Sequence, residues 1–545
     1  MKVLFVIFFV IVSSLNSFGQ QGIYQEWVSR YNGTANAYDG GVSIKTDGSG
    51  NVFISGTSFC VNTSRDYITI KYSSTGGVDW VRTFNGAANG GDYSNAMTLD
   101  NSGNVYVTGR CDNGSTSSDY TTIKYNSGGT QQWVAYYNGP AGGVDEAKTI
   151  AADNSGNVYV SGKSAGQGTG FDIATLKYDA NGNQLWVMRY NGPNNGDDVA
   201  YSMALDGDNN VYICGESNGV GTGDDGVFIK YNSDGVQQWV VRYNGPGNGG
   251  DGFVSVKTDN SNFIYITGFS DGGASTGYDF YTAKYNPQGN QLWAKRYNGM
   301  GNHTDYPSDL GLDQSGNVYV TGGSIGNSDP TDTMYATVKY DNNGNQQWVQ
   351  WYPGPSGSSN MSHALVTDYS GNVIITGSSF YNGFNHYVTI KYDTYGNQKW
   401  LMTYSGLEAG NDFATALAVD INNNVFVTGR SWGIDYDVAT IKYGPELLGI
   451  QTSGNTIPTE YSLEQNYPNP FNPETNIKFS IPVAGDVNLS VYDIQGNKVA
   501  VILNRFLSAN EYNVKWDGTN FSSGVYFYKL QANSIISTKK MMLVK

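Results

Sequence analysis

The sequence predicts an all-β protein, an eight-bladed β-propeller followed by a small Ig-like β-sandwich. Three observations carry this prediction: a composition suited to short strands and turns, a repeat of about 53 residues present eight times, and a change of pattern after residue 444. A period of this length is typical of propellers and other repeat architectures. We expect a propeller at 22–444, a linker at 445–460 and a second domain at 461–545.

The composition favours strands and turns. Of the 545 residues, 71 are Gly and 42 are Tyr, while charged residues make up only 14%. Gly, Asn, Asp and Ser supply turn conformations, whereas Tyr, Val, Ile and Thr suit half-buried pleated surfaces. The formal charge of -16 argues against a nucleic acid partner, because binding phosphates needs clustered Lys and Arg.

The first residues have the pattern of a secretory signal peptide at 1–19. Met1 and Lys2 precede an apolar run from Val3 to Val12, and small residues lead to Gly19. This pattern predicts export by the Sec machinery and cleavage near Gly19. No later segment has the roughly 20 apolar residues that a membrane helix requires, so we expect no transmembrane segment.

The cysteines do not form a disulfide framework. Cys60, Cys111 and Cys214 are too few for one, although an exported protein would reach an oxidising compartment. Cys60 and Cys111 occupy loops that we take as equivalent in neighbouring repeats. They could pair, and the geometry of the loops decides whether they do.

Three landmarks recur in each repeat. One is a strand of the pattern Asp-x-x-Gly-Asn-Val-Tyr-Val-Thr-Gly, as at 100–109, and another is a Thr-rich strand ending in Lys-Tyr, as at Lys124. The third is a tryptophan, which we expect to pack between blades because its position in the strand is constant. These tryptophans are Trp27, Trp80, Trp133, Trp186, Trp239, Trp293, Trp348 and Trp400.

A fourth strand completes each repeat. A short apolar run such as 96–99 precedes each Asp, so the repeat holds strands a, b, c and d, as a propeller blade does. The chain begins on a d strand at 25–33 and ends on strands a, b and c at 413–443. We predict that the first strand completes the last blade and leaves no free sheet edge.

These repeats resemble the bacterial propeller repeats called SBBP over residues 22–444. The resemblance rests on the Asp-x-x-Gly-Asn-Val-Tyr-Val-Thr-Gly strand and on the Trp about 24 residues after it. The hairpin with Asp179, Gly182 and Trp186 is also similar to the tryptophan-docking turn of quinoprotein-type propellers. That similarity implies packing and not a quinone, so we expect no cofactor, with Ca²⁺ the one alternative.

After residue 460 strands of period two lie between Gly and Pro turns, which is typical of a β-sandwich. This stretch resembles the type A (Por) sorting domain of the Gram-negative type IX secretion system. The resemblance implies passage through the type IX machinery, then anchoring to surface lipopolysaccharide or release; an ordinary binding sandwich is the alternative. Its motif residues are Tyr467, Pro468, Asn469, Pro470, Phe471, Asn472, Pro473, Gly496, Gly524 and Tyr526.

A carboxylate recurs eight positions before the Asp of each b strand. Such a ring could bind Ca²⁺ or a cationic ligand, but carboxylates in turns also accept backbone N–H bonds, and we favour that structural role. The ring comprises Asp39, Asp92, Asp145, Asp198, Asp251, Asp305 and Asp412, with Asn360 in the seventh repeat. A second set precedes strand c on the same face, at Asp66, Asp119, Asp172, Asp225, Asp279 and Asp437.

No constellation of catalytic residues is present in the sequence. His303, His363 and His386 lie in different repeats, and the usual nucleophile, metal and nucleotide motifs are absent, so we expect no enzyme. We favour a secreted or surface-anchored binding or adhesion protein with a glycan or protein ligand. A glycan-active hydrolase or lyase and a structural surface-layer component are the alternatives. Binding residues are expected in non-repeating loops such as 164–170 and 324–333.

Overall fold

The computed structural model describes residues 23–114, 117–273, 277–326, 333–355, 359–445, 450–452, 458–483, 485–507, 509–519, 521–532 and 535–545. The predicted signal peptide lies outside these residues, as do parts of the 324–333 loop and of the predicted linker. Every regular element within the described ranges is a β-strand. The strands form two compact units.

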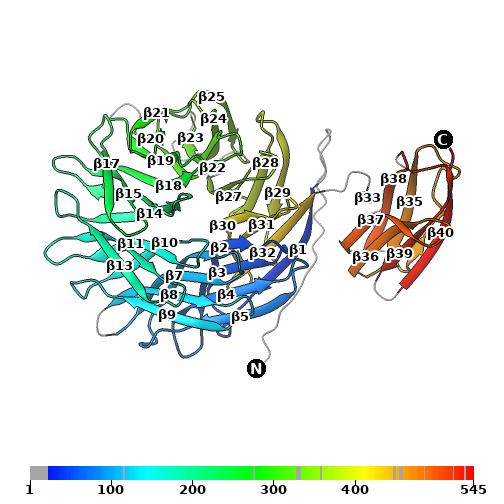
Figure 1. Ribbon diagram of the computed structural model, residues 1–545, viewed down its shortest axis with the longest axis horizontal. Coiled ribbons are helices and arrows are strands. Elements are labelled where there is room, and N and C mark those ends of the chain that lie inside the picture. Colours follow the sequence, from blue (N-terminus) through cyan, green and yellow to red (C-terminus); the bar gives the residue numbers. More distant parts are fainter. Residues whose placement is uncertain are drawn as a thin grey trace. The chain divides into compact units, whose positions relative to one another are not determined.

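The first unit contains seven sheets that each consist of four consecutive antiparallel strands. Within each sheet the first strand is the innermost; β10, β14, β18 and β22 lie nearest the centre and β9, β13, β17 and β25 at the rim (Figure 1). The bounds are β2 (Asp39–Thr46), β3 (Val52–Phe59), β4 (Arg65–Tyr72), β5 (Val78–Phe84), β6 (Tyr93–Leu99), β7 (Val105–Asp112), β8 (Ser118–Tyr125), β9 (Gln131–Tyr137), β10 (Asp145–Ala152), β11 (Val158–Ala165), β12 (Phe171–Tyr178), β13 (Gln184–Tyr190), β14 (Asp198–Leu205), β15 (Val211–Asn218), β16 (Asp224–Tyr231), β17 (Gln237–Tyr243), β18 (Asp251–Thr258), β19 (Ile264–Asp271), β20 (Tyr278–Tyr285), β21 (Gln291–Tyr297), β22 (Asp305–Leu312), β23 (Val318–Ile325), β24 (Thr333–Tyr340), β25 (Gln346–Tyr352), β26 (Asn360–Thr367), β27 (Val373–Tyr381), β28 (Phe384–Tyr392) and β29 (Gln398–Tyr404).

An eighth sheet joins the two ends of this unit. It contains β1 (Ile23–Tyr31), β32 (Tyr436–Pro445), β31 (Val425–Trp432) and β30 (Asp412–Val419), in that order. The first strand therefore pairs with the last repeat, as the register of the chain ends predicts. The eighth sheet also contacts the first, because Thr415 Oγ1 donates a hydrogen bond of 2.7 Å to the Gly41 carbonyl. Within this sheet β1 is the outer edge strand, and its partner is β32.

The b strands form the core because neighbouring sheets cover both of their faces. All residues of β23 except the last are buried, and core clusters combine residues of successive sheets, such as Phe53 with Val105 and Val107. The Gly that ends each b-strand motif is required by a bulge in strand a. A Cβ on Gly109 would lie only 1.9 Å from the Tyr93 carbonyl oxygen, which explains why every repeat keeps this glycine.

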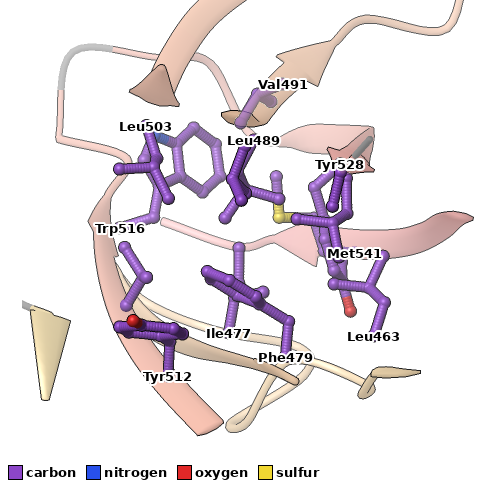
Figure 2. Close-up of a cluster of buried hydrophobic side chains, with 14 of the residues drawn as sticks. Leu463, Ile477, Phe479, Leu489, Val491, Leu503, Tyr512, Trp516, Tyr528 and Met541 are labelled. Carbon is purple, nitrogen blue, oxygen red and sulfur yellow. The ribbon is translucent and has the colours of Figure 1, made fainter. Parts of the chain in front are cut away.

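The second unit is formed by two four-stranded antiparallel sheets. One contains β33 (Ile450–Thr452), β38 (Asn510–Asp517), β35 (Glu474–Ile481) and β34 (Ser462–Leu463). The other contains β37 (Lys498–Leu507), β36 (Gly485–Tyr492), β39 (Gly524–Ala532) and β40 (Ile535–Leu543). The two sheets share one hydrophobic core, in which Ile477 and Phe479 face Leu489, Tyr528 and Met541 (Figure 2).

Two expectations need correction. The stretch predicted as a linker contains β33, which pairs with β38 through Ile450 and Val514, so this unit begins before residue 461. The thiols of Cys60 and Cys111 are free. They are not equivalent, because Cys111 lies within β7 opposite Asp119, where the first sheet has Ser58 opposite Asp66. Cys60 lies two residues further on, beyond the end of β3.

Candidate functional site

The carboxylates of the predicted ring lie at the first residue of an innermost strand or, at Asp92, directly before it, and they are enclosed by protein. Asp92 is fully buried, and its Oδ2 accepts the N–H of Gly86 at 2.6 Å while Oδ1 accepts the N–H of Asp112 at 3.0 Å. The Gly N–H bond recurs at Asp39, Asp145, Asp198, Asp251, Asp305 and Asp412. Each carboxyl thus fixes the loop before its own sheet.

Burial raises the pKa of these carboxyls, to about 7 at Asp39 and to about 6 at Asp305. Asn360 takes the same position in the seventh sheet and donates instead, from Nδ2 to the Pro353 carbonyl at 2.8 Å. Among the described residues, no three His, Cys, Asp or Glu side chains are placed to hold a metal ion. Each ring carboxyl thus makes a structural contact of its own.

Four carboxylates of the second set belong to a repeated ion pair, which we call the arginine latch. In the fourth sheet, Arg242 pairs with Asp225 at 2.8 Å and also donates to Tyr190 Oη of the preceding sheet at 3.0 Å. The latch therefore ties strand d to strand c and to the neighbouring sheet. The same pairing joins Arg189 to Asp172, Arg296 to Asp279 and Arg30 to Asp437.

The other sheets show what can replace the latch. In the sixth sheet Met334 and Trp351 occupy the Asp and Arg positions, and Trp351 Nε1 donates to Tyr297 Oη at 2.8 Å. The link to the preceding sheet is thus kept without charge. Asp66 and Asp119 lack an arginine and accept instead from Thr63 Oγ1 and Asn113 Nδ2, respectively.

The repeat tryptophans dock onto the following sheet. Trp133 Nε1 donates to the Ala180 carbonyl at 3.1 Å, and its ring covers Gly182, which has a φ of +85°. Corresponding Nε1 bonds are made by Trp80, Trp186, Trp239, Trp293 and Trp348. Trp27 and Trp400 are buried as well. These contacts give the tryptophans a packing role, although Trp133, Trp186, Trp239, Trp293 and Trp348 are only half-buried.

Beside these repeated contacts lies a set of positions whose residues change from sheet to sheet. The second residue of strand a and the residue that follows the b-strand Gly pair directly across the ladder, and we call these pairs the variable face. The pairs are Gly40–Thr57, Tyr93–Arg110, Glu146–Lys163, Val199–Glu216, Gly252–Phe269, Tyr306–Gly323, Met361–Ser378 and Phe413–Arg430. Our prediction placed binding residues in loops and did not consider these strand positions. The sequence does mark these positions, because they are the places where the repeat does not keep its residue.

Arginines and aromatic rings alternate along the variable face of the eighth, first and second sheets. The Arg430 guanidinium lies 4.5 Å from the Phe413 ring centre and donates to Tyr38 Oη at 3.1 Å. Arg65 lies 5.1 Å from the ring centre of Tyr38. Arg65 also donates to Tyr93 Oη at 3.0 Å, and Arg110 lies 4.6 Å from the Tyr93 ring centre. We call these six residues the arginine–aromatic array.

One end of the array borders a cavity of about 630 Å³. The cavity is lined by residues of the seventh, eighth and first sheets, among them Tyr38, His363, Phe380, Phe413 and Arg430. Although water reaches the His363 ring, burial by the cavity walls and the charge of Arg430 lower its pKa. This volume is in the range of small-ligand sites, and the lining combines apolar rings with a few polar groups, as such sites do.

A second cavity of about 680 Å³ lies over the third and fourth sheets and differs in its charges. Lys148 and Lys163 face Glu216 and Asp224 across it. Lys148 is also paired with Glu146 at 2.7 Å. Although burial opposes ionisation, the hydrogen bond and charge of Lys148 keep the pKa of Glu146 below its usual value. The charges here compensate one another.

The motif at 466–473 in the second unit is held against the last strand. Phe471 is buried against Trp516 and its N–H donates to the Met542 carbonyl at 3.0 Å. The Asn469 side chain accepts the Met542 N–H, and the Pro468 and Pro473 carbonyls accept bonds from Thr475 and Gly518. Tyr467 is 80% exposed.

The other motif positions shape the second unit. Gly496 lies at a φ of +85° in the turn before β37, Gly524 begins β39, and Tyr526 packs on Trp516. Peptide bonds preceding Pro468, Pro470 and Pro473 are cis, the last of them joining Asn472 to Pro473.

Comparisons with known proteins agree with the repeats and with the C-terminal unit. Residues 465–545 match the family model described as a secretion system C-terminal sorting domain. Residues 79–115, 132–168, 185–221, 292–328 and 402–437 match the SBBP model, described as a beta-propeller repeat. The type IX sorting domain points to the secretion machinery and to the outer-membrane surface. No curated protein matches the chain.

The similar solved structures are distant. A eukaryotic initiation factor covers 87% of this chain and 90% of its own, with 10% identity and a TM-score of 0.34. A mutant of NanB sialidase from Streptococcus pneumoniae covers 78% of this chain and 70% of its own, with 12% identity and a TM-score of 0.34. At these TM-scores the structures give no guide to function. No helix in the described part of the chain is long and apolar enough to cross a membrane.

Proposed function

We propose, from the premise that this chain joins SBBP propeller repeats to a type IX sorting domain, that it is an exported binding protein of the cell surface. In this proposal the eight sheets of the first unit are the blades of an eight-bladed propeller closed by β1, and the C-terminal unit is an Ig-like sandwich. The chain is exported by Sec and then by the type IX machinery. It is then anchored to lipopolysaccharide or released.

The variable face is the observation that supports binding. Buried positions of the repeat keep their residues because each makes the same contact between sheets, as the latch and the docked tryptophans do. The variable face makes no such repeated contact, yet it carries arginines, lysines, glutamate and aromatic rings and borders both cavities. Side chains free of a structural role are those that can be adapted to a ligand.

Binding is favoured over catalysis by the arrangement at His386, where Ser, His and Asp side chains meet. His386 Nδ1 lies 2.8 Å from Ser405 Oγ and 3.9 Å from Asp412 Oδ2, whereas Nε2 faces the Tyr381 carbonyl. A catalytic triad needs the serine and the carboxylate on opposite ring nitrogens. This geometry cannot relay a proton from the serine, so we propose that the protein is not an enzyme.

The test is a binding screen of the purified full chain against immobilised glycans, neutral and acidic, and extracellular proteins. We expect a ligand whose binding weakens at least tenfold in Phe413→Ala or Tyr201→Ala, on the variable-face strands, and is unchanged in Gln238→Ala on the outer strand β17. Binding that is lost only in Gln238→Ala would contradict the proposal. Chemical conversion of a bound glycan would contradict the non-catalytic part.

A further inference from the structure

The arginines of the array lack the carboxylate partners that the latch arginines have. Among the described residues, Arg65, Arg110 and Arg430 form no ion pair, and the Arg430 side chain has Tyr38 Oη as its protein hydrogen-bond acceptor. A guanidinium carries five N–H donors in a planar fork. Most of those on Arg430 therefore have no acceptor in the described protein, and Arg430 lines the cavity.

The ring carboxyl groups next to Tyr38 and Tyr93 do not cancel the charge of the array. Asp39 directly follows Tyr38 in the sequence, and Asp92 directly precedes Tyr93. Both carboxyl groups are buried, and burial raises the pKa of each. Their oxygens accept backbone N–H groups of their own sheets. The charge of Arg110 acts on the Glu146 carboxylate, whose pKa it helps to lower, whereas Arg430 and Arg65 have no ion pair among the described residues. In a chain with a formal charge of -16, the Arg430 guanidinium at the cavity favours an anionic ligand.

The aromatic residues restrict the kind of anion. Tyr38, Phe380 and Phe413 line the same cavity as Arg430, so a ligand there meets ring faces and a guanidinium together. An inorganic anion would use only the guanidinium. A sugar ring offers C–H faces that pack on aromatic rings, and a carboxylate or sulfate on that sugar accepts the paired N–H groups of arginine.

The geometry points to an acidic saccharide as the ligand of this cavity: a glycan chain bearing uronate or sulfate groups, with an acidic group on Arg430 and a sugar ring on Phe413 and Tyr38. In this inference the glycan continues past Tyr38 towards Arg65. The Arg65 guanidinium lies 5.6 Å from the Tyr93 ring centre. This inference rests on the proposed binding function and names its ligand class. Carboxylated and sulfated glycans share the chemistry and are separated by the test.

The test measures the affinity of the full chain by calorimetry for oligogalacturonate, for its methyl ester, and for chondroitin sulfate oligosaccharides with and without their sulfates. We expect oligogalacturonate or chondroitin sulfate to bind and the neutral methyl ester to bind at least tenfold more weakly. Affinity falls as NaCl rises, because salt screens exposed charges. The sulfate-free chondroitin arm shows whether the uronate alone is sufficient.

Variants locate the site. Arg430→Gln is expected to weaken binding at least tenfold and Arg430→Lys to give an intermediate loss, because lysine keeps the charge but not the fork. Lys295→Gln, which removes a positive charge from the exposed outer strand β21, is the matched control and should bind like the wild type. If Arg430→Gln does not fold, Arg65→Gln tests the same inference from another sheet, because Arg65 lies in β4 and Arg430 in β31.

Equal binding of the ester and the acid, or equal losses in Arg430→Gln and Lys295→Gln, would overturn the acidic-saccharide inference. The proposed function would survive that result if another ligand in the screen lost binding in Phe413→Ala. Both the proposed function and the acidic-saccharide inference would fail if no ligand in the screen lost binding in the variable-face variants.

Discussion

The arginine latch and the arginine–aromatic array use the same side chain in the same unit for opposite purposes. Each latch arginine has a carboxylate at 2.7 to 2.8 Å and a tyrosine hydroxyl from the preceding sheet. The array arginines have aromatic neighbours and no carboxylate partner among the described residues. Repetition of a contact therefore indicates structure, and a departure from the repeat indicates a surface available for binding.

The largest effect should come from breaking one latch. Arg242→Ala leaves Asp225, whose side chain is 11% exposed, without its cation, and loss of one partner of a buried pair costs about 3 to 5 kcal/mol. We expect a loss near the lower value, measured by urea unfolding of the first unit. The double variant Asp225→Met/Arg242→Trp, which copies the sixth sheet, should recover most of it. No recovery would show that the latch is not exchangeable between sheets.

A loss of similar size should follow when a docked tryptophan is displaced. A Cβ on Gly235 would lie 2.8 Å from the Trp186 ring, and its φ of +84° disfavours any side chain. Overpacking costs about 1 to 3 kcal/mol and the backbone about 1 to 2 kcal/mol, so Gly235→Ala should destabilise the first unit by about 3 kcal/mol.

Gly496→Ala is the matched control. Gly496 has nearly the same φ, +85°, in an equivalent turn, but no atom lies within 4 Å of its added Cβ. Only the backbone cost of about 1 to 2 kcal/mol should appear, in the unfolding of the second unit. Equal losses in the two variants would show that the tryptophan contact contributes nothing.

Repetition also explains what the sequence could predict. Strand order, the pairing of the first strand with the last repeat and the docked tryptophans follow from landmarks that recur every 52 to 55 residues. The array could not be predicted in this way, because Tyr38 and Arg430 are 392 positions apart and meet only when the eighth sheet contacts the first. The three-residue strand β33 was missed because so short a run has no period.

The buried carboxylates should give a pH-dependent effect of intermediate size. Asp39→Asn cannot satisfy the same N–H donors, and an unsatisfied buried group costs about 1 to 3 kcal/mol. Because burial raises the pKa of Asp39 to about 7, the folded state holds its proton where the unfolded chain releases it. The stability due to Asp39 is thus greatest below the unfolded pKa and declines as pH rises to about 7.

Unfolding of wild type and Asp39→Asn at pH 5 and pH 8 checks this prediction. Asparagine does not titrate, so the deficit of the variant should shrink at pH 8. A deficit that is the same at both pH values would mean that the Asp39 carboxyl does not titrate in this range.

The smallest effect on stability should come from the array. Arg110→Gln removes a guanidinium that stacks on Tyr93 but has no ion pair among the described residues, and a single exposed cation–aromatic contact is worth about 0.5 to 1 kcal/mol. We expect the free energy of unfolding in urea to fall by no more than about 1 kcal/mol, against about 3 kcal/mol for Arg242→Ala. A loss as large as that of the latch variant would show that Arg110 has a structural role like that of a latch arginine, and the distinction between repeated and variable arginines would then fail.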